Sequence, residues 1–394
     1  MLINTAIRQR IYPTKSQESL FWLFFGHCRF VWNFFLELIT QEYQEHKKSF
    51  SYLECSLKLT KMKRQKEYLW LGQISAISLQ QSLRMLQTAF QRFFKKQANY
   101  PKFKKKYKKE SFHLMKNGFR LENGKLYIAR CKTPIKVRWS KKLPSDPSSI
   151  TISRDSANRF FVTFIVEEKF VKLPETDQKI GIDVGLINWI VDSKSGKISR
   201  INYTKEYSKI LAYWQRKLKL NQKKHKKGAV LKKGSQKFKK IKLKIAKICM
   251  KIADLRKNRI HQETARIINE NQVIVLESLK VKNMLRNHKL AKSIADASWG
   301  EVVRQLVYKA LRKGRKTIFI DQWFPSSKMC SKCHHIHHEL ELNDRTWVCP
   351  HCQAELDRDI NAAINILAYG LWVLASGETG SGVEEYLLYL EKAQ

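Results

Sequence analysis

Two closely spaced cysteine pairs constrain this chain more than any other feature of its sequence. Cys330 and Cys333 form one C-x2-C pair, and Cys349 and Cys352 form a second, with fifteen residues between the pairs. This spacing predicts a short hairpin that brings four thiolates to one tetrahedral Zn²⁺, a zinc ribbon over residues 325–353. Two disulfides or four unpaired core thiols are the alternatives, but each C-x2-C pair is too tight for an easy internal disulfide.

Carboxylates occur at three constrained places in the chain. Asp359, with Asp357 before it, lies where a helix-forming run begins, a position at which Asp is favoured as a cap. Asp183 and Glu277 each end an apolar run typical of a buried strand. A salt bridge would account for either one alone, because an unpaired buried charge is costly. Together, Asp183, Glu277 and Asp359 predict a divalent-metal site for phosphodiester chemistry.

The charge of the chain limits its partners. The sequence has 76 Lys and Arg against 34 Asp and Glu, a formal net charge of +42. Such an excess repels itself unless a polyanion is bound, so nucleic acid is the expected partner and a membrane surface is the alternative. No apolar run approaches the roughly 20 residues that span a bilayer, and the first residues lack a secretory signal. We therefore expect a cytoplasmic, nucleoid-associated protein.

The first hundred residues predict one strand and a helical lobe. Residues 1–15 alternate in a strand-like way, and residues 16–99 contain two helical stretches rich in aromatic and aliphatic side chains. Residues 100–175 then alternate in short runs with an Asn-Gly turn, which predicts a small antiparallel β-barrel completed by the N-terminal strand.

A basic segment with interleaved aromatic residues opens the second part of this barrel. Tyr100, Phe103 and Tyr107 alternate with lysines there. A solvated charge run would not need the rings, whereas a nucleic-acid groove uses cations for phosphates and rings for bases or sugars. The segment therefore predicts nucleic-acid backbone contacts by Lys102, Lys104, Lys105 and Lys106.

Residues 203–270, between Asp183 and Glu277, predict a helical hairpin. Apolar residues step by 3 and 4 from Phe238 to Leu255, as in a coiled-coil seam, and a lysine-rich tip joins the two helices. The last segment, 375–394, is typical of a flexible tail without chemistry. The fold class expected overall is α+β with several domains.

The blocks GIDVGL, VIVLESL, WFPSSKMCSKC, WVCPHC and DRDINAAINI resemble the TnpB family, the OrfB proteins of insertion sequences and relatives of type V CRISPR effectors. The likeness runs from about Ile7 to about Leu374. It implies an RNase H-like (RuvC) α/β nuclease domain split over 176–324 and 354–374, into which the helical hairpin and the zinc ribbon are inserted. The barrel would be the wedge domain, and the helical lobe its recognition insertion.

The resemblance also implies an activity. The protein would be a prokaryotic, transposon-associated, RNA-guided DNA endonuclease that acts by two-metal-ion hydrolysis, with Mg²⁺ or Mn²⁺ held by Asp183, Glu277 and Asp359. Its guide RNA would come from the transposon end, its substrate would be double-stranded and single-stranded target DNA, and it would act as a monomer with one RNA. The alternatives are a nuclease-silent RNA-guided repressor and a guide-independent zinc-ribbon DNA-binding or transposition protein.

Further residues follow from matching the family's motifs. Tyr52, Ser56 and Gln80 match the face that reads a short motif beside the target, although ordinary exposed helix polars would look the same. Asp359 matches the catalytic acid, which leaves Asp357 as the helix cap. His334 and Gln353 stand where the family's zinc knuckles usually have Gly, and the neighbouring histidines offer competing metal ligands.

Overall fold

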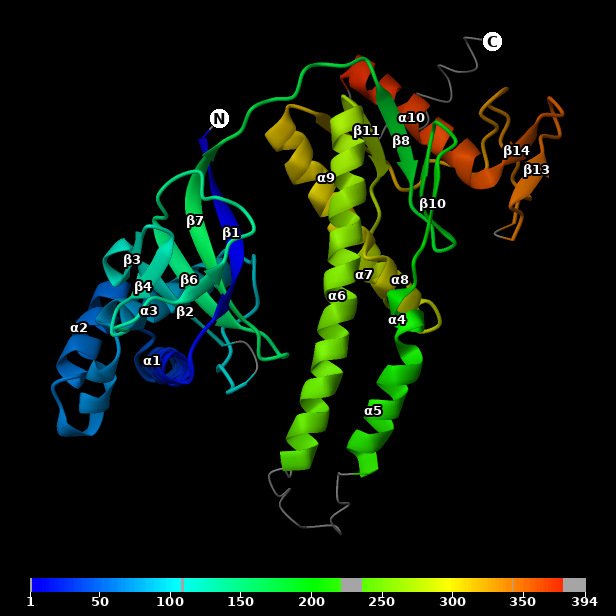
Figure 1. Ribbon diagram of the computed structural model, residues 1–394. Helices are drawn as coiled ribbons and strands as arrows, with labels where there is room; N and C mark the ends of the chain where they lie inside the picture. The colour runs from blue at the N-terminus through cyan, green and yellow to red at the C-terminus, as the bar shows by residue number, and fades with distance from the viewer. Residues whose placement is uncertain (1, 108–109, 221–235, 342, 378–394) are drawn as a thin grey trace. The chain divides into compact units, whose positions relative to one another are not determined.

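The computed structural model describes residues 2–107, 110–220, 236–341 and 343–377 (Figure 1). The chain divides into two compact units, Met1–Lys169 with Leu220–Met250 and Phe170–Lys219 with Lys251–Gln394. The lysine-rich tip between the hairpin helices and nearly all of the C-terminal tail, residues 221–235 and 378–394, lie outside the described residues.

The first unit is built on a five-stranded antiparallel sheet with the strand order β2-β6-β7-β1-β5. Its strands are β1 (Leu2–Tyr12), β2 (Glu110–Met115), β5 (Lys136–Arg138), β6 (Ser149–Arg154) and β7 (Phe160–Lys169). The N-terminal strand pairs with β7 along nearly its whole length, so the expected joining of residues 1–15 to the later strands is confirmed.

The strands β3 (Phe119–Glu122) and β4 (Lys125–Ile128) form a separate two-stranded hairpin in the same unit. It turns at Asn123 and Gly124, both with positive φ, as the predicted Asn-Gly turn requires. A single bridge, Leu126 to Ile135, links the hairpin to the start of β5. The ladders among the described residues leave the sheet open between β2 and β5, whereas the sequence predicts a closed barrel. At one end of this order, β5 is only three residues long and forms its ladder with β1.

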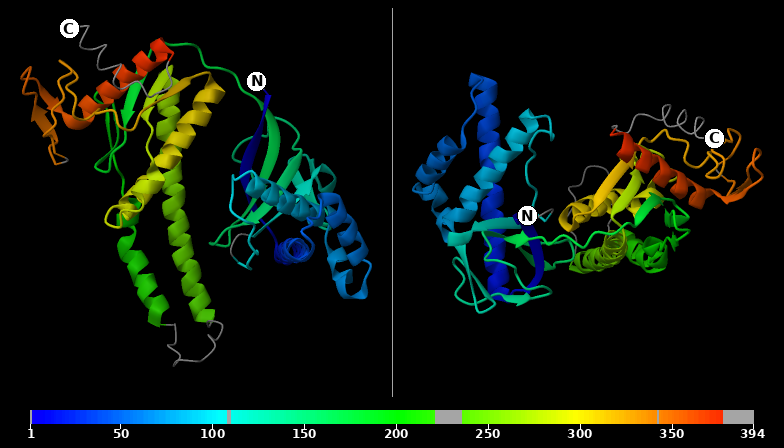
Figure 2. Two further views of the ribbon diagram at one scale, coloured as in Figure 1. Left: turned by 180° about the vertical axis from the view of Figure 1, so that it is seen from behind. Right: turned by 90° about the horizontal axis from the view of Figure 1, so that it is seen from above.

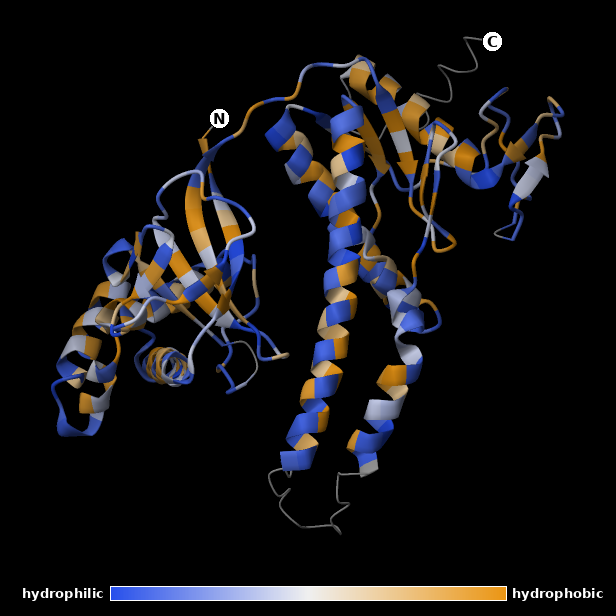
Figure 3. Cartoon of the chain, in the orientation of Figure 1, coloured by the Kyte–Doolittle hydropathy of each residue, from blue (hydrophilic) through white to orange (hydrophobic). Residues whose placement is uncertain are grey.

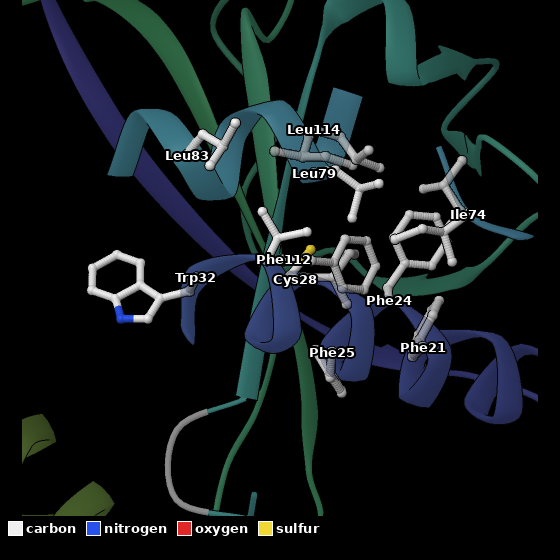
Figure 4. Packing of buried hydrophobic residues seen from close by; sticks show 14 of the residues in the cluster. Phe21, Phe24, Phe25, Cys28, Trp32, Ile74, Leu79, Leu83, Phe112 and Leu114 are labelled. Carbon is white, nitrogen blue, oxygen red and sulfur yellow. The ribbon is translucent and has the colours of Figure 1, made fainter. Parts of the chain in front are cut away.

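Helices cover this sheet and share its core. They are α1 (Lys15–His46), α2 (Tyr52–Met62), the 3-10 helix η1 (Lys66–Gln73) and α3 (Ala76–Phe94). Thr14 and Gln17 form a reciprocal capping box that starts α1. Figure 4 shows Phe21, Phe24 and Phe25 of α1 against Phe112 of β2, and the rings of Phe24 and Phe112 stack at 4.3 Å. The aromatic residues noted in the sequence therefore form a buried core that joins the helices to the sheet.

The second unit contains a mixed sheet with the strand order β10-β9-β8-β11-β12. Its strands are β8 (Lys179–Asp183), β9 (Asn188–Asp192), β10 (Lys197–Ser199), β11 (Val273–Glu277) and β12 (Lys316–Ile320). The strands β8, β11 and β12 run parallel, and β9 and β10 are antiparallel additions at one edge.

Helices pack on both faces of this sheet. On one face lie α7 (Val281–Met284), α8 (Ala291–Ala297), α9 (Trp299–Lys313) and the part of α6 (Gln236–Glu270) after Met250, and on the other lies α10 (Arg358–Ser376). Two further helices, α4 (Tyr203–Glu206) and α5 (Ser208–Leu220), precede α6 in the chain. Side chains alternate along a strand, so Ile274 and Leu276 face α6 and α9 while Val273 and Val275 face α10. Figure 2 shows α10, in red, on the opposite face of the sheet from α6.

The hydropathy of the helices follows this layering. Figure 3 shows α6 with mixed polar and apolar positions and α10 largely apolar. Among the described residues, α10 is the one helix long and apolar enough to span a membrane by length and composition. It makes extensive contacts with β8, β11 and β12, as a core helix of the sheet does.

Candidate functional site

The three predicted acids lie at the carboxyl ends of two neighbouring strands, β8 and β11, and at the start of α10. Asp183 is the last residue of β8 and Glu277 the last of β11, and the parallel register pairs Ile182 with Leu276. Asp183 therefore lies beside Glu277. The side chains of Asp183 and Glu277 lie on the face of the sheet that packs on α10. Each is two residues after a position on that face, Gly181 and Val275, and residues two apart on a strand share a face. Asp359 lies in the first turn of α10.

Burial and the neighbouring charges raise the pKa values of two of these carboxylates. Burial, followed by the charges of Glu277 and Asp359, raises the pKa of Asp183 to about 7. Burial also raises the pKa of Glu277, although the Ser326 hydroxyl donates a hydrogen bond of 2.8 Å to Glu277 Oε1. Buried like charges are unfavourable unless a cation balances them. Carboxylate oxygens are the donors that hard divalent ions such as Mg²⁺ or Mn²⁺ prefer. In the described structure the three carboxylates do not all lie within 4.8 Å of one another, so they do not form a ligand set for a single ion.

The two aspartates at the start of α10 have different surroundings. Asp357 is the N-cap, since its Oδ1 accepts from the Ile360 N–H at 3.0 Å, and its Oδ2 pairs with Lys197 Nζ at 2.5 Å. The predicted cap is thus confirmed. Asp359 instead accepts from the Asn188 amide at 3.0 Å and lies 3.6 Å from an Arg345 guanidinium nitrogen.

Two glycines set the position of α10 on the sheet. A Cβ at Gly181 would lie 2.2 Å from the Ala363 carbonyl oxygen, and a Cβ at Gly370 would lie 2.2 Å from a methyl group of Val275. Real Cβ atoms do not approach so closely, so side chains at these positions would push helix and sheet apart. Asp359 would move with the helix.

Two buried asparagines of α10 hold the segment that leads into the first cysteine pair. Asn361 and Asn365 each donate to the Met329 carbonyl, at 2.7 and 2.6 Å, and Asn365 also donates to the Ser326 carbonyl at 2.8 Å. The side-chain oxygen of Asn361 accepts from the Ser331 N–H at 2.8 Å. These residues, together with Ser326 and Asn188, were not identified from the sequence. Polar Asn residues four apart in an apolar helix were the available signal.

The four cysteines form a compact cluster. Their sulfur atoms all lie within 4.8 Å of one another, and the distances from Cys330 to Cys352 and from Cys333 to Cys349 are both 3.6 Å. Tetrahedral zinc–thiolate bonds of about 2.3 Å place sulfurs roughly 3.8 Å apart, so the cluster fits Zn²⁺. All four thiols are free, which excludes the two-disulfide alternative. The strands β13 (Thr346–Val348) and β14 (Glu355–Asp357) connect this cluster directly to α10.

The two residues that depart from the family pattern both have the backbone conformation that favours Gly. His334 and Gln353 have φ of 60° and 59°, the left-handed conformation that explains why Gly is usual there. Histidines contribute no ligand to the one metal-sized cluster found in the described parts of the chain. His335 stacks on His351 and His337 lies against Trp347 instead.

The predicted backbone-contact lysines differ in exposure. Lys102, Lys105 and Lys106 are exposed. Lys104 is turned inward, with its ammonium nitrogen 3.8 Å from the centre of the Trp32 ring, and burial lowers its pKa. The segment is fastened to α1 because Asn33 bonds to both the N–H and the carbonyl of Lys104. Lys104 thus anchors a segment whose other lysines face solvent.

The predicted motif-reading residues lie on α2 and α3, which pack together. Tyr52 and Ser56 are partly buried on α2, and Gln80 is exposed on α3. Arg84, one turn after Gln80, places its guanidinium 4.7 Å from the centre of the Tyr52 ring and connects the two helices. A groove of about 430 Å³ continues along α3 and is lined by Arg84, Arg92 and both polar and apolar neighbours, among them Gln81 and Met85. Arg84 was not singled out from the sequence.

Comparison with known proteins identifies the family. The "Probable transposase" model of the IS605 OrfB group matches residues 161–288, and the "Cas12f1-like, TNB domain" model matches 299–366. A "Helix-turn-helix domain" model of the OrfB group matches 1–48, where the structure has a strand and one long helix. A Streptomyces pristinaespiralis protein, provisionally named an RNA-guided DNA endonuclease, is 38% identical over 95% of this chain and 92% of its own length. The chain belongs to the TnpB family.

Other relatives agree with this assignment. The Escherichia coli protein InsQ, with the same provisional description, is 28% identical to this TnpB-family chain over 95% of it and 94% of InsQ. The fold resembles that in a cryo-EM structure of a Cas12f1–sgRNA–target DNA complex, with 16% identity and a TM-score of 0.56. That match covers 90% of this chain and 83% of the Cas12f1 chain, so both units of the protein have counterparts in a known fold.

Proposed function

We propose that this TnpB-family protein is a transposon-associated, RNA-guided DNA endonuclease with a RuvC-like active site. The observation that carries the proposal is the convergence of Asp183, Glu277 and Asp359 at one sheet edge, with the pKa of Asp183 raised to about 7. Family membership and the names of the bacterial relatives support the same activity.

The residues of the site would divide the catalytic work. Divalent ions bound by Asp183, Glu277 and Asp359 would activate the attacking water and stabilise the leaving 3′ oxygen. Ser326 orients Glu277 through its hydroxyl, and Asn188 orients Asp359 through its amide. Arg345, 3.6 Å from Asp359, partly balances the acidic cluster and lies where it can attract a DNA phosphate.

The other parts of the chain would hold the nucleic acids. We assign residues 176–324 and 354–374 to the nuclease domain, with 203–270 as its helical insertion, and residues 325–353 to a zinc ribbon. The ribbon would support the nuclease site, since its first segment carries Ser326. Residues 1–15 and 100–175 would form the wedge domain and 16–99 the recognition lobe.

The partners follow from charge and exposure. The net charge of +42 suits a complex with both guide RNA and target DNA, in a cytoplasmic, DNA-associated protein that acts as a monomer with one RNA. Lys102, Lys105 and Lys106 would contact backbone phosphates. Tyr52, Ser56 and Gln80, together with Arg84, would face the motif beside the target.

Purification followed by a cleavage assay tests the proposal. We expect the protein to co-purify with an RNA of discrete length and to cut DNA that matches this RNA, only with Mg²⁺ or Mn²⁺. The Asp183→Asn variant should bind the same RNA and target without cutting. Wild-type protein that binds the target without cutting would indicate a repressor, and RNA-free protein fully active on DNA would exclude the guided mechanism.

A further inference from the structure

One tryptophan in the segment that leads to Ser326, the residue that contacts Glu277, has no structural explanation in the protein's own packing. Trp323 is 80% exposed, more than any other large apolar side chain in the described parts of the chain. It lies in the segment between β12 and the zinc ribbon, three residues before Ser326, which contacts Glu277. A single exposed apolar residue is ordinary on a protein surface. The surroundings of Trp323 are what distinguish it.

The segment that carries Trp323 is held rigidly on both sides. Phe324, the next residue, is buried and stacks on Tyr369 of α10 with ring centres 4.4 Å apart. On the other side the Asp321 carboxylate accepts from the Trp323 N–H at 2.7 Å. These contacts fix the backbone with Phe324 pointing inward and Trp323 outward, so the exposed ring is presented from a fixed support.

The polar edge of the indole is already satisfied within the protein. When the Gln322 amide is oriented so that its oxygen accepts, that oxygen takes the indole N–H at 2.9 Å and the Lys280 ammonium at 3.2 Å. The need of the indole N–H for water therefore does not account for the exposure. What remains exposed is the apolar ring, with the cation of Lys280 held beside it.

We propose that Trp323 is a stacking platform for an unpaired base of the DNA strand delivered to Asp183, Glu277 and Asp359, with Lys280 at an adjacent phosphate. This inference rests on the proposed nuclease function and adds a binding position to it. An unpaired base offers a π-face that stacks on an aromatic ring, and a nearby cation holds its phosphate. Bases within a duplex are stacked on each other, so the platform selects a single strand.

Binding of the strand tests the platform without cleavage. In the guide-RNA complex of an Asp359→Ala background, we expect Trp323→Ala to weaken binding of the single-stranded DNA segment about 5- to 150-fold, which corresponds to about 1–3 kcal/mol. Trp323→Phe should retain most of the affinity because a ring remains. Leu311→Ala, which removes another exposed apolar side chain, serves as the matched control and should change nothing.

An abasic scan identifies the stacked base. With Trp323 present, one abasic nucleotide near the scissile bond should reduce binding by the same factor as Trp323→Ala, and in Trp323→Ala the same substitution should add no further loss. Equal losses at all positions in both proteins, or unchanged binding by Trp323→Ala, would overturn the platform. Cleavage separates the two proposals. If Trp323→Ala, with no other change, cleaves the target with the KM of the wild-type protein, the platform is rejected and the nuclease proposal stands. If the wild-type protein does not cleave, the nuclease proposal itself is rejected.

Discussion

The assignment of separate roles to Asp357 and Asp359 can be tested by replacing each with Ala. Asp357 accepts the Ile360 N–H and pairs with Lys197, and Asp359 lies among the other carboxylates. Asp359→Ala should abolish cleavage and retain guide RNA and target binding, because the metal site needs the third carboxylate for both charge and geometry. Asp357→Ala should leave a functional nuclease of lower stability.

The structure gives the size of the stability loss in Asp357→Ala. An N-cap contributes about 0.5–2 kcal/mol, and a partly exposed ion pair such as Lys197–Asp357 contributes about 0.2–1 kcal/mol. The sum is about 0.7–3 kcal/mol, which lowers the Tm of a unit of 150–250 residues by about 1–12 °C. Asp357→Ser keeps a capping oxygen and loses only the ion pair, so its Tm should fall by less.

Thermal unfolding and single-turnover cleavage, both measured on the guide-RNA complex, check the two variants together. Strong cleavage by Asp359→Ala would refute the metal-ligand assignment. The reasoning would also fail if Asp357→Ala lost all cleavage while keeping the wild-type Tm, because a cap acts through the stability of the helix start rather than through chemistry.

Three further predictions concern other parts of the molecule. Without divalent ions, the free energy of unfolding should fall as the pH rises from about 4 to about 7. The reason is that the pKa of Asp183 is raised to about 7 in the native state, so the native protein keeps a proton that the unfolded chain has already released. Mg²⁺ or the Asp183→Asn change should reduce this slope in denaturant titrations, and an identical slope under all three conditions would contradict the prediction. Cys349→Ser should lower zinc content and soluble yield, since thiolate binding of Zn²⁺ supplies folding free energy, and elemental analysis that finds no zinc in active wild-type protein would overturn this. Gln80→Ala should weaken target cleavage by about 1–3 kcal/mol and alter the tolerated flanking bases, and an unchanged preference in a randomised-flank assay would show that Gln80 is not at the motif.

The sequence predicted the site's chemistry better than its geometry. A tetrahedral zinc ion bound by four thiolates requires closely spaced cysteine pairs, so the cluster of four cysteines could be predicted from the sequence alone. Asp183 and Glu277 were recognisable because, with Asp359, they made three carboxylates in constrained places, whereas a salt bridge would have explained either one alone. The Asp357 cap followed from its place before a helical apolar stripe, and the structure confirms it.

Long-range polar contacts were beyond sequence reasoning. Ser326 and Asn188 are ordinary surface residue types, and only the fold brings them to Glu277 and Asp359. Lys104 looked like its neighbouring lysines, but the position of Trp32 on α1 turns it inward. The sheet of the first unit was expected to close, but β2 and β5 at its two ends share no ladder among the described residues. The alternation pattern predicts strands and does not specify which of them pair.

The convergence of the three acids depends on two features that act together. The parallel register of β8 with β11 places Asp183 and Glu277 side by side, and the alternation along each strand turns both toward α10. Alternation is visible in the sequence, but register is not, because residues 184–272 separate the two strands. The distance to Asp359 is then set by Gly181 and Gly370, where helix and sheet approach too closely for any Cβ. A glycine inside a helix costs about 1 kcal/mol relative to Ala, and the local sequence around Gly370 does not show why it is there. In the fold, the absence of its side chain lets α10 carry the third carboxylate to the other two.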